Sequence, residues 1–296
     1  MKYLRSKTNR YLFIILLIAS FFIILIFYFL NNLNNNNELI NKLENSLSTT
    51  KNLFEEQKRY ALSLAILLSK DKEIINSFLK QEREDSFKIV NKKIKTLKQL
   101  QDSTFEVQIH NKNLTTYLRS WDINIKDVPL SSFRQGLVKV KEEKKPIVSI
   151  ELGKRLNIKA ISPIMINDNY FGSIEVIIDF EYLSHELEKK GCELFVLLNK
   201  KHLNIANELK TNPSIDNYVL VNNANIKLLF QLNLDNLKDY GYVSNKNYSF
   251  VYFSYYDLNN KHLGYIFTGL KNNKQLNINN NYGYETVNID SKVKIK

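Results

Sequence analysis

The chain has 296 residues, 44% hydrophobic and 12% aromatic, with a formal net charge of +12 at pH 7. This length and apolar content predict one large hydrophobic core or two smaller ones. A single cysteine, Cys192, excludes an intramolecular disulfide. The lysines are spread along the chain rather than clustered, so we interpret the charge as a solvated basic surface and expect no nucleic-acid partner.

An uncharged apolar segment lies near the N-terminus, from Tyr11 to Leu30. About twenty such residues form a helix that can cross a hydrocarbon core of roughly 30 Å. A cleaved signal peptide is the alternative, but its apolar region usually has about 7 to 15 residues and a small-residue cleavage site follows it. This segment is longer, and no such site follows Leu30. We therefore predict an uncleaved transmembrane signal anchor over residues 11–30.

The charges that flank this segment predict its orientation. Four basic residues precede it: Lys2, Arg5, Lys7 and Arg10. The first charged residue after it is Glu38. Because basic flanks stay in the cytoplasm, we expect residues 1–10 to be cytoplasmic and the bulk of this single-pass inner-membrane protein to be periplasmic. No second apolar segment follows, so no output domain of its own is expected.

Residues 31–101 are predicted to form a long helix and a helical lead-in. Apolar residues recur there at three- to four-residue spacing or multiples of it: Leu39, Leu43, Leu47, Phe54, Ala61, Leu64 and Leu68. This spacing is typical of an amphipathic helix, which continues the membrane helix outward. Shorter helical patterns follow around Ile74 to Leu79 and from Phe87 to Leu100.

A first α+β module is predicted over residues 102–190. Phe105, Val107 and Ile109 alternate with polar residues, which indicates a strand that ends at His110. A helical stretch with Phe133, Leu137 and Val140 then leads to three predicted strands: 147–152, 157–166 and 170–179. The last two strands flank Asn-Asp-Asn at 167–169, a sequence that tolerates turn conformations and predicts an antiparallel hairpin.

A second module is predicted over residues 191–271. A polar helix at 182–190 ends at Gly191, which is a favourable residue for stopping a helix. Further strands are predicted at 194–198, 218–221, 248–256 and 263–270. Residues 272–296 are rich in Asn and Lys without periodicity, so a poorly ordered tail is expected.

Little in the sequence indicates catalysis. The four histidines, His110, His185, His202 and His262, are scattered and none has metal-ligand spacing. Phosphate-binding loops and the motif around a nucleophilic serine are absent as well. We therefore predict that the protein is not an enzyme and that it uses neither a metal nor a cofactor.

Two arginines and the only tryptophan lie close together in the sequence. Arg119 and Trp121 are two residues apart, and Arg134 follows shortly after. Arginine binds carboxylates through a planar fork of donors, and tryptophan offers a flat apolar wall, so the group suits a small polar ligand. The alternative is structural, in which Arg119 or Arg134 forms an ion pair with Glu151 or Glu175 and holds loops to the sheet.

These segments resemble the third class of double Cache sensor ectodomains. The resemblance lies in Ile109-His110, Leu118-Arg119-Ser120-Trp121-Asp122, Leu130-Ser131-Ser132-Phe133-Arg134, Ile150-Glu151-Leu152-Gly153, Ile161-Ser162-Pro163-Ile164 and Gly172-Ser173-Ile174-Glu175. It implies an α+β fold with a long N-terminal helix and two tandem PAS-like (Cache) modules with antiparallel sheets, behind a single transmembrane helix. It also implies a set of ligand-binding residues: Arg119, Trp121, Arg134, Glu151, His110, Lys159 and Glu175.

The chain departs from that class at three places. The sequence from Ile125 to Pro129 replaces a Gly-Asp-Asp-like turn, Ser149 replaces a glycine, and Lys159 replaces an arginine. Lysine keeps the positive charge but loses the planar fork, so this departure favours a ligand that differs from those of its relatives.

The resemblance implies an extracytoplasmic sensor for signal transduction of the chemotaxis type. The membrane-distal module (102–190) would bind a small molecule, a carboxylate among the options, and the module at 191–271 would lie nearer the membrane. Occupancy would reach a receptor or kinase partner, or act through a homodimer of the long helix. The alternative is a ligand-free Cache-fold protein with an interaction or structural role in the cell envelope.

Overall fold

The computed structural model describes residues 7–99, 104–235 and 237–272. It divides the chain into two units, Met1–Asn45 and Ser46–Lys296. Helix α1 (Lys7–Ser69) begins in the first unit and ends in the second. The predicted tail lies outside the described residues, apart from Asn272.

The first unit contains an apolar helical segment that could cross a membrane. It extends from Arg10 to Leu30, has 21 residues and a mean hydropathy of 3.1. A helix satisfies its own backbone hydrogen bonds, and this length suits a hydrocarbon core of about 30 Å. The described residues contain no second segment of this kind.

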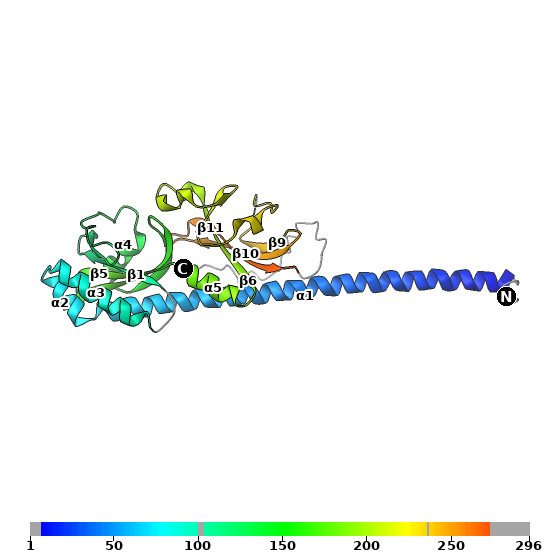
Figure 1. Ribbon diagram of the computed structural model, residues 1–296, viewed down its shortest axis with the longest axis horizontal. Helices are drawn as coiled ribbons and strands as arrows, with labels where there is room; N and C mark the ends of the chain where they lie inside the picture. The colour runs from blue at the N-terminus through cyan, green and yellow to red at the C-terminus, as the bar shows by residue number, and fades with distance from the viewer. Residues whose placement is uncertain (1–6, 100–103, 236, 273–296) are drawn as a thin grey trace. The chain divides into compact units, whose positions relative to one another are not determined.

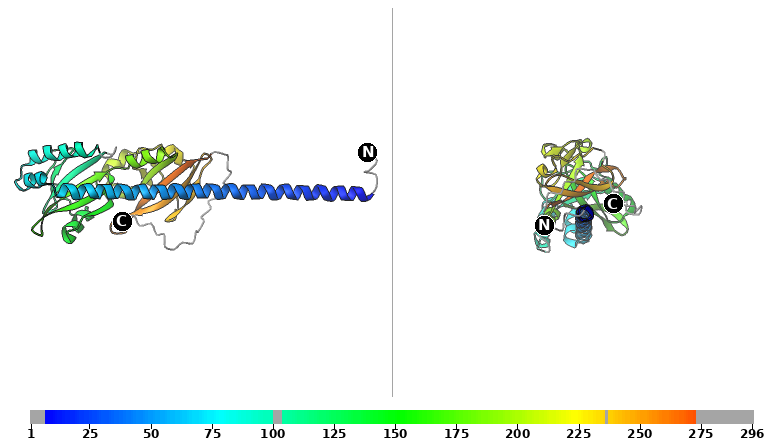
Figure 2. Two further views of the ribbon diagram at one scale, coloured as in Figure 1. Left: turned by 90° about the horizontal axis from the view of Figure 1, so that it is seen from below. Right: turned by 90° about the vertical axis from the view of Figure 1, so that its right-hand side faces the viewer.

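The part of α1 in the second unit packs along both sheets of that unit (Figures 1 and 2). Its buried apolar residues follow the predicted helical spacing: Leu47, Phe54, Ala61, Leu64, Ala65 and Leu68. Two buried hydroxyl pairs accompany this stripe. Thr50 Oγ1 lies 2.9 Å from Thr268 Oγ1, and Ser69 Oγ lies 2.8 Å from Ser162 Oγ. One helix therefore contacts both sheets directly.

Two short helices follow α1, as the apolar spacing predicts. They are α2 (Lys72–Leu79) and α3 (Arg83–Leu97). The side chain of Asp71 caps α2 by accepting hydrogen bonds from the backbone amides of Glu73 and Ile74, which satisfies donors that a helix start leaves unpaired.

The first sheet has five antiparallel strands in the order β2-β1-β5-β4-β3. The strands are β1 (Phe105–Asn111), β2 (Thr116–Arg119), β3 (Ile147–Leu152), β4 (Leu156–Ile166) and β5 (Asn169–Ile178), with α4 (Gln135–Glu143) between β2 and β3. The predicted hairpin is present, since β4 pairs antiparallel with β5. Asn167 and Asp168 at its turn have φ of 46° and 60°, a conformation that these residue types tolerate.

The second sheet has six strands in the order β7-β8-β6-β11-β10-β9. Its strands are β6 (Cys192–Asn199), β7 (Ser214–Ile215), β8 (Tyr218–Leu220), β9 (Tyr240–Ser244), β10 (Tyr248–Tyr256) and β11 (His262–Lys271). Helix α5 (Glu181–Glu188) precedes them, and three short 3-10 helices lie between them: η2 (Lys200–His202), η3 (Asn207–Thr211) and η4 (Ile226–Leu229). The polar helix stops before Gly191, whose φ is 74°. The α+β fold with two antiparallel sheets is therefore confirmed.

Candidate functional site

The two faces of the first sheet differ in chemistry. One face carries apolar residues and Ser162, which contacts α1. The other face carries buried polar residues. Along a strand, successive residues alternate between the two faces of the sheet, and residues paired across neighbouring strands lie on the same face. Gln108 pairs with Glu175 and with Arg119, and His110 pairs with Ser173. The polar face is therefore the place where this module concentrates charge.

Arg134 lies between two carboxylates on this polar face. It precedes the first turn of α4, and its Nη2 donates to Glu175 Oε1 and, over 3.3 Å, to Glu151 Oε2. Glu151 Oε1 also accepts a hydrogen bond of 2.8 Å from the amide of Gly136. A Cβ at Gly136 would lie 2.9 Å from Ile161 and 3.0 Å from Glu151. Glycine therefore permits α4 to approach the sheet this closely.

Both members of the Arg134–Glu175 pair have shifted ionisation. Burial alone raises the pKa of Glu175, but the Arg134 charge brings it well below its usual range. Burial alone lowers the pKa of Arg134, but the Glu175 and Glu151 carboxylates raise it above its usual value. The Arg134 and Glu175 charges therefore stabilise each other in a buried position that water does not solvate.

His110 is completely buried beside this pair. Its Nδ1 lies 3.1 Å from Ser173 Oγ, and its Nε2 lies 3.5 Å from Glu175 Oε2 without hydrogen-bond geometry. Burial lowers the pKa of His110 and outweighs the opposite effect of Glu175. The imidazole is therefore neutral at pH 7.

Lys159 on β4 is a second cation on this face and is 3% exposed. It forms no side-chain hydrogen bond within the described residues. Burial, and then the Arg134 charge, lowers the pKa of Lys159 to about 8. Its ammonium lies against Gly153, where a Cβ would be 2.6 Å from Nζ. Glycine at 153 therefore gives the ammonium its space.

Arg119 ends strand β2 and is 9% exposed. Its guanidinium carbon lies 5.6 Å from the centre of the Trp121 ring, a cation–π contact. Among the described residues it donates no side-chain hydrogen bond, and its Nε is buried without a partner. Burial lowers the pKa of Arg119, although Glu175 opposes this effect. A buried guanidinium with open donors can accept an anion.

The loop that carries Trp121 is fixed by Arg83 on α3. Arg83 Nε donates to the carbonyl of Tyr117 over 2.8 Å, and Nη2 donates to the carbonyls of Ile123 and Ile125. Trp121 itself stays 41% exposed. The indole is therefore held in place while one part of it remains open to solvent.

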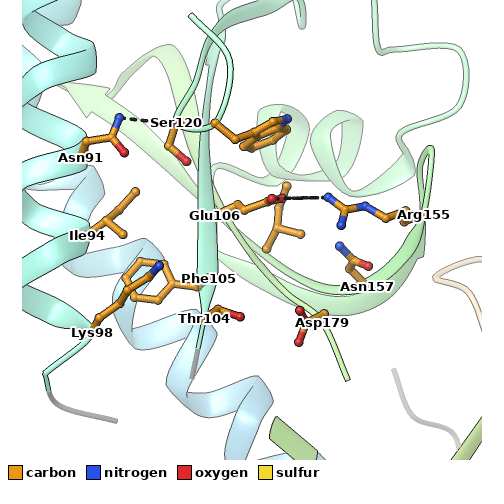
Figure 3. Close-up of a pocket in the computed structure, with 12 residues that line it drawn as sticks. Asn91, Ile94, Lys98, Thr104, Phe105, Glu106, Ser120, Arg155, Asn157 and Asp179 are labelled. Carbon is orange, nitrogen blue, oxygen red and sulfur yellow. Dashed lines mark hydrogen bonds and ion pairs between the residues drawn. The ribbon is translucent and has the colours of Figure 1, made fainter. Parts of the chain in front are cut away.

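Trp121 lines a pocket of about 280 Å³, shown in Figure 3. The other lining residues are Asn91, Ile94, Lys98, Thr104, Phe105, Glu106, Ser120, Arg155, Asn157, Ile177 and Asp179. Arg155 Nη2 forms an ion pair with Glu106 Oε2 at 3.2 Å across it. Two of the lining residues lie close to the buried charges along their strands. Asn157 is two residues before Lys159 on β4, and Ile177 is two residues after Glu175 on β5. The pocket therefore adjoins the buried charges.

The candidate residues from the sequence thus fall into two groups. His110, Arg134, Glu151, Lys159 and Glu175 interact in one buried cluster, which we call the charge cluster. Arg119 and Trp121 form a separate pair beside the pocket. Arg134 forms ion pairs with Glu151 and Glu175, as the structural alternative from the sequence has it. Arg119 forms no such ion pair within the described residues.

Sequence reasoning missed Glu106, Arg155 and Asn157, which line the pocket. A signal was present for two of them. Glu106 alternates with apolar residues along the first predicted strand, and Asn157 stands two positions before Lys159 on the third. Strand alternation therefore places both on the polar face with the candidate residues.

The matching region of the second sheet is filled by side chains. Its core cluster contains Phe195, Phe250, Tyr252, Tyr265 and Phe267, all buried. Phe250 and Tyr252 pack so closely that a Cβ at Gly269 or Gly241 would lie 2.6 Å from one of them. The described parts of both modules contain no group of three or more His, Cys, Asp or Glu residues that could hold a metal ion.

Comparison with known proteins gives one family match. A family model for the double sensory domain of two-component sensor kinase, the third double Cache class, matches residues 36–270. No curated protein sequence matches the chain.

Solved structures with a similar fold include the sensor domain of the V. cholerae histidine kinase DctB. It is 12% identical with a TM-score of 0.50, and the match covers 80% of this chain and 99% of that one. The ligand-binding domain of the Campylobacter jejuni chemoreceptor Tlp3, solved in complex with L-valine, is 16% identical with a TM-score of 0.45, and the match covers 81% and 95%. At this identity, the DctB match supports the fold alone.

Proposed function

The chain belongs to the third class of the double Cache family, the double sensory domain of two-component sensor kinases, and from this membership we propose that it is a membrane-anchored extracytoplasmic sensor of a small molecule. The single observation that carries the proposal is a pair of buried cations, Arg119 and Lys159, without hydrogen-bond partners in the described residues. Buried charges are normally paired. These two are therefore best explained by a ligand that supplies the missing acceptors.

The charge balance of this region supports an anionic ligand. Three buried cations, Arg119, Arg134 and Lys159, face two buried carboxylates, Glu151 and Glu175. With His110 neutral, one positive charge remains uncompensated. A carboxylate-bearing molecule would compensate it, with its carboxylate toward Arg119 and Lys159 and the rest of the molecule against Trp121 in the adjoining pocket.

Each candidate residue has a role in this proposal. Arg119 and Lys159 bind the anionic group, and Trp121 packs against the remainder. Arg134, Glu151, Glu175 and His110 hold the polar face in shape, because their contacts with one another fix Arg134 between two strands. The ligand is bound and released unchanged, so we assign no enzymatic activity.

The proposed topology rests on the apolar segment and its flanks. Arg10–Leu30 would span the inner membrane, and the basic residues before it would hold the N-terminus in the cytoplasm. Residues 102–190 would then form the membrane-distal module and residues 191–271 the proximal one, both in the periplasm. The long helix leads back from these modules to the membrane.

Occupancy would be reported through α1, because this helix contacts both sheets. A ligand can shift the helix only if it binds two arrangements of the module with different affinity. The shift would reach a receptor or kinase partner, or would change a homodimer formed by the long helix. Both outputs use the same helix.

A second candidate function is a ligand-free interaction or structural protein of the cell envelope. The observation that favours it is the engagement of Arg134 by two carboxylates, which leaves this arginine less able to bind a ligand. The filled core of the second sheet agrees with it. In this case the charge cluster would serve only the fold.

A thermal-shift screen of the full chain in nanodiscs separates the two candidates. The probes are amino acids, dicarboxylates, short monocarboxylates, amines and purines. A ligand at about 100 times its Kd adds roughly 2.7 kcal/mol of stability, which raises Tm by several degrees. We expect an anionic compound to do so, to be recovered unchanged by mass spectrometry, and to lose its effect in Trp121→Ala.

Phe230→Ala is the matched control for this variant, because Phe230 is also exposed, at 49%, but lies outside the pocket. It should respond to the ligand as the unmodified chain does. If no anionic compound raises Tm, the sensor proposal is wrong and the structural candidate stands.

A further inference from the structure

A second hollow lies on the first module, away from the Trp121 pocket. This groove has a volume of about 650 Å³ and shares no lining residue with that pocket. It lies where the end of α2, the β1–β2 turn, α4 and the start of β5 meet. We call it the Phe171 groove, after one of its lining residues: Phe78, Leu79, Gln81, Asn111, Lys112, Asn113, Lys141 and Phe171.

The floor of the Phe171 groove is apolar and open to water. Leu79 is 41% exposed and Phe171 is 38% exposed, while Phe78 beneath them is buried. Large exposed apolar residues are few in the described part of the second unit: Leu67, Leu79, Trp121, Phe171 and Phe230. Two of these five lie in one groove. Apolar side chains that gather in a polar surround are typical of an interaction site.

The rim of the groove is basic. Lys112 and Lys141 line it, and its lining contains no acidic residue. Neither lysine forms an ion pair within the described ranges of the chain. The remaining polar residues, Gln81, Asn111 and Asn113, are uncharged. The groove therefore combines an apolar floor with an uncompensated positive rim.

The wall formed by Gln81 is held in an unfavourable backbone conformation. Gln81 has φ of 60°, in the left-handed region that non-glycine residues seldom adopt. Its side-chain amide donates to the carbonyl of Phe78 over 2.9 Å, and its backbone amide donates to the same carbonyl over 3.1 Å. Such conformations persist where the surrounding structure fixes them, often at binding sites. The wall is therefore formed before any partner binds.

We propose that the Phe171 groove docks an acidic peptide segment of a partner protein, with apolar side chains on Phe171 and Leu79 and carboxylates beside Lys112 and Lys141. A symmetric contact of two copies through this groove is disfavoured, because it would bring the lysines of both copies together without an acidic partner in the lining. The groove is broad and open, whereas a small ligand is usually enclosed over most of its surface. This docking is independent of the ligand site.

The proposal is tested with two labelled peptides and the full chain in nanodiscs. One peptide alternates glutamate with phenylalanine and leucine, and the other has lysine in place of each glutamate. Fluorescence anisotropy should show at least tenfold tighter binding of the acidic peptide. Phe171→Glu should weaken that binding at least tenfold, because it removes an apolar contact and adds a repelling charge.

Matched variants keep the test specific. Phe230→Glu changes another exposed phenylalanine, 49% exposed against 38% for Phe171, and should leave binding unchanged. The double variant Lys112→Glu/Lys141→Glu should reverse the preference toward the lysine peptide, whereas Lys126→Glu/Lys210→Glu, which changes two exposed lysines elsewhere, should not. Circular dichroism establishes that each variant is folded.

Three results would overturn the proposal. The first is equal affinity for the two peptides, and the second is unchanged binding by Phe171→Glu. The third is self-association of the chain that Phe171→Glu abolishes, since this would assign the groove to a second copy.

Discussion

The guanidinium of Arg134 and the carboxylate of Glu175 form an ion pair in which the two side chains are only 4% and 0% exposed. Arg134 belongs to the turn before α4, and Glu175 belongs to β5. The pair therefore ties a covering helix to the centre of the sheet. When one partner of a buried ion pair is removed, the other charge is left buried without its counterion. This loss destabilises the folded state strongly.

The first prediction concerns Glu175→Gln. This change leaves Arg134 with Glu151 alone and raises the excess positive charge of the polar face. The free energy of unfolding should fall by about 3 to 5 kcal/mol. Urea unfolding of the full chain in nanodiscs measures it, with fluorescence of Trp121, the single tryptophan, as the signal.

Glu106→Gln is the control for this prediction. Glu106 is a strand glutamate of the same sheet, but its side chain is 33% exposed and it pairs with the half-exposed Arg155. Partly exposed pairs stabilise by about 0 to 1 kcal/mol. Equal losses in the two variants would contradict the view that burial gives the Arg134–Glu175 pair its importance.

Much of the fold follows from local patterns in the sequence. Alternation at Phe105, Val107 and Ile109 predicts β1, and Asn-Asp-Asn at 167–169 predicts the β4–β5 hairpin. The resemblance to the third double Cache class, which is confirmed by the match over residues 36–270, implies the two-sheet fold. These patterns succeed because each depends on residues close together in the chain.

Other features depend on residues far apart in the chain. Strands β2, β7 and β9 have four, two and five residues, too short for a clear alternation. Alternation therefore does not predict β2, the strand that ends at Arg119. The sequence also leaves open whether Arg134 binds a ligand or a carboxylate, because the choice depends on how α4 lies on the sheet.

The second prediction concerns alkaline pH and Lys159. Burial lowers the pKa of Lys159 to about 8, whereas an unfolded lysine has a pKa of about 10.4. Below pH 8 the lysine is protonated in both states, so the folded state bears the full unfavourable burial of its charge. Between about pH 8 and 10.4 the folded state loses the proton first, and the free energy of unfolding should rise.

Lys159→Met isolates this effect. Urea unfolding at several pH values from 7 to 10 should show that the difference between the unmodified chain and Lys159→Met shrinks as pH rises. At pH 7 the variant should be the more stable of the two, since apolar replacement of a buried charge is often favourable. Lys126→Met, at an exposed lysine, should show no such trend. A pH-independent difference for Lys159→Met would contradict the prediction.

The third prediction concerns Gly153→Ala. The added methyl would lie 2.6 Å from Lys159 Nζ and 3.9 Å from its Cε. The flexible ammonium must move, while the backbone need not. A loss of about 0.5 to 1 kcal/mol is expected in the unmodified chain, and almost none in Lys159→Met, whose side chain is one atom shorter. A double-mutant cycle measures this coupling. Additive effects of the two changes would contradict the contact.

The fourth prediction concerns Arg83→Lys, which keeps the charge but removes the fork that binds three carbonyls, those of Tyr117, Ile123 and Ile125. One ammonium cannot reproduce that geometry, and a partly buried carbonyl left without a donor costs about 1 kcal/mol, the low end of the range for buried groups. The loss should be local as well as global, because the carbonyls of Ile123 and Ile125 belong to the loop that carries Trp121, and the carbonyl of Tyr117 belongs to β2 just before it.

Hydrogen–deuterium exchange measured by mass spectrometry distinguishes a local loss of stability in this loop from a global loss. Exchange should accelerate in residues 120–126 of Arg83→Lys while the strands of the second sheet stay protected. Arg59→Lys is the control, since Arg59 is exposed on α1 and its side chain donates no hydrogen bond within the described ranges. If exchange in residues 120–126 stays as slow in Arg83→Lys as in Arg59→Lys, then the loop is fixed by Trp121 and its neighbours rather than by Arg83.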